Sequence, residues 1–89
     1  MDDFKFDMTE DVAKGRYANL ALITHTRDEF IVDFALAYPQ RNPVVTARVV
    51  TSPRHAKALL RSLEDNIRRY EAHHGVIPEP QRTDADGSN

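Results

Sequence analysis

The pattern that most limits what this chain can fold into is the run of residues 30–38. Its even positions are all apolar, and its odd positions mix Asp33 with small or branched apolar residues. Strict alternation over this length is typical of a strand with one firmly buried face. The chain is therefore expected to build a sheet around a face formed by Phe30, Val32, Phe34, Leu36 and Tyr38.

Two further strands are expected, at residues 17–26 and at residues 44–51, the second of which is rich in β-branched side chains. The segment 39–43 begins and ends with proline, which predicts a turn. Arg48 lies in the middle of the third strand, so it must reach solvent or an acidic partner. We expect it to pair with Asp33 on the wetter face of the sheet.

The short link between the first two strands predicts a hairpin but leaves its register open. A three-residue loop would place Leu20 and Leu22 on the face of Phe34. A two-residue loop would place Ala21 and Ile23 there instead, because one residue of slip reverses every side chain. We favour the first register, since it gathers more apolar bulk.

A helix is expected over residues 53–74. Ser52 can cap its first turn with the side-chain hydroxyl, and proline is favoured at the first helical position. Gly75 is expected to end the helix, with Val76 folding back toward Tyr70. A helix of this length spans about 33 Å, which is enough to cover the sheet lengthwise.

One side of the expected helix is apolar at a spacing of three and four residues. Packing onto the chain's own sheet is the interpretation we favour, and packing against a partner helix is the alternative. The repeat covers too few heptads to define a coiled coil. The apolar residues are Ala56, Leu59, Leu60, Leu63, Ile67 and Tyr70.

The predicted fold class is α+β, with a three-stranded antiparallel β-meander packed against one long C-terminal α-helix. This domain covers residues 17–77. Residues 1–16 form either a short N-terminal edge strand, because three apolar residues alternate with polar ones, or an arm that orders on docking. Residues 78–89 are almost entirely polar and are expected to be disordered.

Such a fold leaves apolar surface uncovered. One helix covers one face of the sheet, so the other face would expose side chains such as Ile31 and Ala35. Three strands also leave two open edges. Pairing of two copies solves both problems, so we expect a homodimer or a higher oligomer.

Composition excludes several classes of function. The 89 residues carry 12 basic and 14 acidic side chains, so bulk charge predicts neither a nucleic-acid partner nor membrane binding. Without cysteine there is no disulfide, zinc–thiolate site or thiol catalysis. We find no signal-peptide pattern and no apolar stretch of membrane-spanning length, so a cytoplasmic location is expected.

No constellation of residues predicts chemistry. His73 and His74 are neighbours on the helix and point about 100° apart, and no histidine pair has the spacing of a metal site. The three glycines are scattered, so there is no phosphate-binding loop. We therefore expect no catalytic, cofactor-binding or metal site, and we do not expect an enzyme.

The expected helix also has a basic bias on one side. Contact with nucleic acid through this basic face is the main alternative function. The interleaved acids Glu64 and Asp65 favour a merely solvated surface instead. The basic face consists of Arg54, Lys57, Arg61 and Arg68.

Two blocks of the sequence match a known family pattern. The first is Glu10-Asp11-Val12-Ala13, Gly15, Tyr17-Ala18-Asn19-Leu20-Ala21, Ile23-Thr24-His25-Thr26 and Glu29-Phe30-Ile31-Val32-Asp33-Phe34. The second is Ser52-Pro53-Arg54-His55-Ala56-Lys57, Leu59-Leu60, Leu63, Asn66-Ile67, Tyr70-Glu71, Gly75 and Ile77. The pattern resembles the small bacterial family catalogued as domain of unknown function 3467. That family carries no assigned activity, cofactor or catalytic residue, so the resemblance implies domain boundaries and leaves the function open.

The resemblance also draws attention to polar residues within its motif, namely Tyr17, Asn19, His25 and His55. They either close loops and cap ends, which we favour, or form a polar recognition patch. The sequence as a whole predicts a small homo-oligomeric interaction module. It would bind another protein through its apolar sheet surface or an open strand edge, as an adaptor or chaperone-like subunit does. The alternative is a nucleic-acid-binding regulator.

Overall fold

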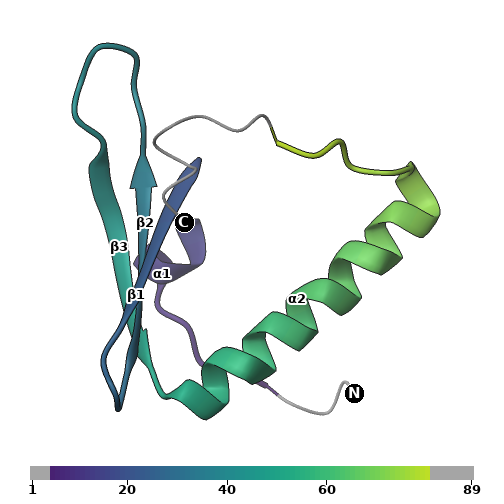
Figure 1. Cartoon of the computed structure of the whole chain (residues 1–89), viewed down its shortest axis with the longest axis horizontal. Coiled ribbons are helices and arrows are strands. Elements are labelled where there is room, and N and C mark those ends of the chain that lie inside the picture. The colour runs from purple at the N-terminus through teal and green to yellow at the C-terminus, as the bar shows by residue number, and fades with distance from the viewer. Residues whose placement is uncertain (1–4, 81–89) are drawn as a thin grey trace.

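The computed structural model describes residues 5–80 and contains a three-stranded antiparallel sheet and a long C-terminal helix (Figure 1). The predicted α+β class is confirmed, and the strands follow one another in the order β1-β2-β3. The third strand and the long helix have the predicted limits. In chain order the elements are α1 (Glu10–Lys14), β1 (Leu20–His25), β2 (Phe30–Leu36), β3 (Val44–Thr51) and α2 (Pro53–His74).

The register favoured for the first hairpin is wrong. Ala21 lies opposite Phe34 and Ile23 opposite Val32, as the two-residue loop requires. The backbone N–H of Thr26 donates to the Glu29 carbonyl at 2.9 Å, which closes the loop around two residues. The Thr26 hydroxyl also accepts the N–H groups of the next turn residues, at 3.3 and 3.2 Å. This local hydrogen bonding outweighs the gain in apolar bulk on which the prediction was based.

The hairpin between β2 and β3 turns over the segment 39–43, as predicted, with Gln40 at a φ of 63°. The Arg41 guanidinium lies 5.2 Å from the centre of the Tyr38 ring and covers it. The pairing shifts by one residue after Phe34, where Thr46 donates its hydroxyl to the Phe34 carbonyl at 3.2 Å. This bulge twists the strand pair locally.

The ends of α2 follow from local chemistry. The backbone N–H of His55 donates to the Ser52 hydroxyl at 3.2 Å, and Pro53 occupies the first turn. Gly75 has a φ of 93° and ends the helix by donating its N–H to the Glu71 carbonyl at 3.0 Å. The expectation for Val76 is wrong, because its side chain remains 83% exposed.

The N-terminal segment contains a short helix that the sequence analysis did not predict. Residues 5–9 belong to no strand, and α1 follows them, with the Thr9 hydroxyl accepting from Val12 N at 3.3 Å. Phe4, which was part of the predicted edge strand, lies outside the described residues. Residues 78–80 belong to no helix or strand, and the rest of the predicted disordered tail also lies outside the described residues.

The helix α2 leaves the end of β3 and diverges from the sheet, so that the two form the arms of an open V (Figure 1). Only Ser52 separates the last residue of β3 from the first residue of α2. Among residues 5–80, the buried apolar side chains are Val32 and Ala35, with 9% and 2% exposure, so the expectation that Ala35 is exposed on the other face is wrong. The favoured packing of the helix onto its own sheet is therefore confirmed only near the first turns of α2, and most of the apolar side of the helix stays uncovered.

We predict that Ser52→Ala lowers the free energy of unfolding by about 1 kcal/mol, because the first turn of α2 loses its side-chain cap. Urea denaturation at a fixed protein concentration measures the change. The matched control is Ser62→Ala, at an exposed position in the middle of the same helix. It should leave stability unchanged or slightly raised, since alanine is the better helix former. Equal losses in both variants would contradict the capping role.

Candidate interaction surface

An apolar groove runs along the sheet face that looks into the V. We call it the sheet groove and define it by Val32, Phe34, Ala47 and Val49, with Val12 of α1 on one wall. It joins two hollows, since Phe34 and Val49 line both. One hollow of about 580 Å³ lies under α1, and one of about 350 Å³ lies where α2 begins, against His55 and Leu59.

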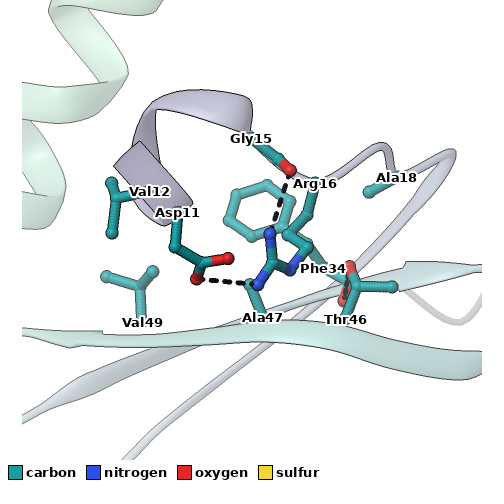
Figure 2. Close-up of a pocket in the computed structure, with 9 residues that line it drawn as sticks. All are labelled: Asp11, Val12, Gly15, Arg16, Ala18, Phe34, Thr46, Ala47 and Val49. Atoms are coloured by element: carbon teal, nitrogen blue, oxygen red, sulfur yellow. Dashed lines mark hydrogen bonds and ion pairs between the residues drawn. The ribbon is translucent and has the colours of Figure 1, made fainter. Parts of the chain in front are cut away.

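Figure 2 shows how α1 forms the wall of the larger hollow. Gly15, at a φ of 76°, ends α1 and directs the following chain across the sheet. The Arg16 guanidinium donates to the Gly15 carbonyl at 3.2 Å and to the Asp11 carboxylate at 3.1 Å. The rim of the groove is therefore charged and self-paired, whereas its floor is apolar.

The opposite arm of the V carries the second apolar surface, which we call the helix stripe. Its side chains are between 39% and 55% exposed, although each is large and apolar. Soluble monomers rarely leave a contiguous apolar strip of this kind in water. The helix stripe consists of Leu59, Leu60, Leu63, Ile67 and Tyr70.

The other face of the sheet, which we call the far face, is organised around an ion pair. Asp33 and Arg48 lie directly opposite each other on β2 and β3. The Arg48 Nε and Nη2 atoms donate to the two carboxylate oxygens at 2.6 and 2.9 Å, so the predicted pairing is confirmed. These hydrogen bonds hold the pKa of Asp33 below its ordinary value of 3.8 and raise the pKa of Arg48. Around this pair, the far face also exposes the apolar side chains of Leu22, Val45 and Val50.

The four residues of the predicted recognition patch lie at two ends of the sheet. Asn19, just before β1, donates its amide to the Ala37 carbonyl at 3.3 Å and accepts the Ala37 N–H at 2.8 Å. This pair of bonds ties the start of β1 to the end of β2. Tyr17 lies in the loop before it and is exposed.

The two histidines of that patch lie at the opposite end of the sheet. His25 stacks on Phe30, with ring centres 5.4 Å apart, and Phe30 pairs with Thr51. His55 Nδ1 lies 3.2 Å from the Ser52 hydroxyl, in the first turn of α2. The structure therefore brings His25 and His55 to one end and places Tyr17 and Asn19 at the other, about 20 Å away along β1.

The basic face of α2 is exposed and mixed in charge. Asp65 lies between its members and approaches Arg68 at 3.7 Å and Arg69 at 3.5 Å. Arg61 borders the same shallow surface, together with Glu64. Arg54 and Lys57 lie closer to the helix start and are exposed as well. The face lies on the other side of the helix from the stripe, because its residues are rotated from the middle of the stripe by about 110–170°.

Residues 5–80 contain neither a cluster suited to a metal ion nor a membrane-spanning helix. No group of three or more histidine, aspartate and glutamate side chains is arranged to hold a metal ion in that part of the chain. Within the same residues, no helix combines the length and apolarity needed to cross a membrane.

The fold and surfaces define a class: a small α+β protein with a free helix and an exposed apolar groove. The family described as "Protein of unknown function (DUF3467)" matches residues 1–79, so the chain belongs to that family, as the sequence resemblance predicted. Neither a curated protein nor a solved structure matches the chain significantly.

The α1 wall of the groove was not predicted from the sequence. The signal was present, because Thr9 precedes two acidic residues, and Lys14 and Gly15 follow at the distance of one short helix. This is the usual order of a cap, an acidic first turn, a basic last turn and a terminating glycine. The alternation of apolar residues in the preceding segment directed the prediction to a strand instead.

We predict that the far-face ion pair makes stability depend on pH in acid. A carboxylate whose pKa is lower in the folded than in the unfolded state stabilises the fold at pH values above the unfolded pKa. That contribution is fully present above about pH 5 and is lost as the pH falls from about 4 through the lowered pKa of Asp33. Urea midpoints of the wild type and of Asp33→Asn should therefore differ at neutral pH and converge in acid.

The control for this experiment is the Arg48→Met background. Without the guanidinium, the acid-dependent difference between Asp33 and its asparagine variant should shrink or disappear. A difference that persists unchanged in that background would show that another group lowers the pKa.

Proposed function

We propose that the protein is a small homo-oligomeric interaction module that binds another protein and catalyses no reaction. The observation that carries this proposal is the exposure of two large apolar surfaces, the sheet groove and the helix stripe, on one chain. Exposed apolar surfaces of this extent mark sites of protein contact. Adaptors and chaperone-like subunits use surfaces of this kind.

The strand edge of β1 is the part of the sheet best suited to a protein partner. Its outer edge pairs with no other strand among the described residues. Edge strands usually carry protection, such as a charged residue, a proline or a bulge. On β3, Arg48 and the bulge at Thr46 supply such protection. The sequence of β1, Leu-Ala-Leu-Ile-Thr-His, has neither charged residue nor proline, so an extended segment of a partner can add to it.

Nucleic-acid binding through the basic face of α2 is the alternative. It has less support, because Asp65 pairs with the arginines there and the chain has a net charge of −2. The two functions respond differently to salt. Contacts with phosphate weaken steeply as salt rises, whereas strand addition and apolar contacts do not.

The test is capture of partners by the tagged protein from a lysate of its own cells at about 50 and 200 mM salt, with bound protein and nucleic acid both quantified. We expect a discrete protein that remains bound at the higher salt. Ala21→Pro should reduce its capture at least several-fold. The alternating hydrogen bonds that begin at Thr26 leave the Ala21 N–H on the open side of β1, where proline removes it.

Ala21→Val is the matched control, because it keeps the N–H group and suits a strand, and circular dichroism should show both variants folded. Capture that survives Ala21→Pro would contradict recognition through this edge. Recovery of nucleic acid that is lost at the higher salt and abolished by Arg61→Glu with Arg68→Glu would support the alternative function instead.

A further inference from the structure

The two apolar surfaces of this chain are complementary, yet they do not meet. The sheet groove is an apolar hollow, and the helix stripe is a row of exposed apolar side chains along α2. Of the stripe residues, Leu59 contributes to the hollow at the root of the helix, next to Val32 and Val49. Further along, α2 diverges from the sheet (Figure 1), and the side chains of Leu63 and Ile67 are 54% and 39% exposed.

The connection between β3 and α2 explains why the chain does not close on itself. Strand-to-helix connections that let a helix fold back over its own sheet usually take two to six residues. Here Ser52 is the whole connection, and its hydroxyl is used in capping the helix. Pro53 follows with a fixed φ, which removes further freedom. Closing the V would require unwinding the first turn of α2 or the end of β3.

We propose that a second copy of this chain occupies the sheet groove. In this dimer the helix stripe of each protomer lies in the sheet groove of the other, across a two-fold axis. The proposal deepens the proposed function, on which it rests, by assigning the self-association to one pair of surfaces. A two-fold arrangement uses each surface once per protomer and therefore covers both at the same time.

The exposed area is what a stable dimer needs. The helix stripe together with Val12, Ile23, Phe34 and Val49 is between 38% and 63% exposed, residue by residue. Taking about 150–250 Å² for a fully accessible side chain of this size, these residues expose roughly 800 Å² per chain. A standard specific interface also buries about 800 Å² on each partner.

The placement of charge agrees with this arrangement. The basic face of α2 points away from the helix stripe, and the Asp33–Arg48 pair lies on the far face of the sheet. Docking the stripe into the groove therefore leaves no unpaired charge buried in the interface. Such a buried charge would destabilise the dimer. The charged pair of Asp11 and Arg16 stays at the rim of the groove. The outer edge of β1 stays free for the protein partner.

Light scattering at micromolar concentration tests the self-association. The wild type should have twice the mass of one chain. Leu63→Asp, in the middle of the helix stripe, should raise the dissociation constant by at least about 30-fold, since it places a charge at the centre of the interface. The matched control is Arg61→Asp, which introduces the same residue on the opposite side of the helix and should leave the dimer intact.

Chemical crosslinking tests the geometry, because the natural chain has no cysteine to interfere. Two single variants, Leu63→Cys in the stripe and Val49→Cys in the groove, are mixed and treated with a short bifunctional maleimide. We expect a covalent product that contains one chain of each kind. Arg61→Cys, on the basic face, replaces the stripe variant as the control and should give little product with Val49→Cys.

Three outcomes would overturn the proposed dimer. A monomeric wild type overturns the proposal, and so does crosslinking of Leu63→Cys with itself in place of the mixed product, because that would indicate helix-to-helix pairing. A further variant carries both Leu63→Cys and Val49→Cys in one chain. Crosslinks confined to single chains of this variant would show that the V closes on itself, which also overturns the proposal. Because these readouts need no partner, failure of the dimer is distinguishable from failure to capture another protein at the β1 edge.

Discussion

The one-residue connection at Ser52 is the constraint on which the rest of this structure depends. Because β3 and α2 follow each other without a loop, the direction of the helix is set by the end of the strand and by the capped first turn. The capping bond stabilises the helix start, and the same geometry keeps the helix away from the sheet. The exposed stripe, the open groove and the small core are therefore consequences of a single local feature.

The two faces of the sheet differ in the side chains at their centres. The groove side is apolar and is bordered by α1 and the root of α2. On the far face, the bidentate pair of Asp33 and Arg48 joins β2 to β3 by side chains as well as by backbone. A charged pair in the centre of one face makes the stacking of two sheets there less favourable.

Much of the fold could be predicted from the sequence, wherever the local signal was unambiguous. The limits of β3 and α2 follow from β-branched residues, the Ser52-Pro53 pair and Gly75, all of which act within a few residues of the feature they determine. The register of the first hairpin could not be chosen on apolar bulk, because the Thr26 hydroxyl decides it. The position of α2 relative to the sheet depends on the length of one connection, which periodicity does not report. The groove was likewise unpredictable in detail, since α1 supplies one wall of it.

The small core has a consequence for the life of the protein in a cell. Val32 and Ala35 alone are buried among residues 5–80, so an isolated chain has little to hold it together. Under the proposed pairing, its folding would be a second-order process, and the fraction of intact protein would rise with the amount synthesised. At concentrations above the dissociation constant of the dimer, the chains would persist as dimers. At lower concentrations, the unpaired chains would be removed by proteases. The protein would then bind its partner only when its own concentration is high enough for dimers to form.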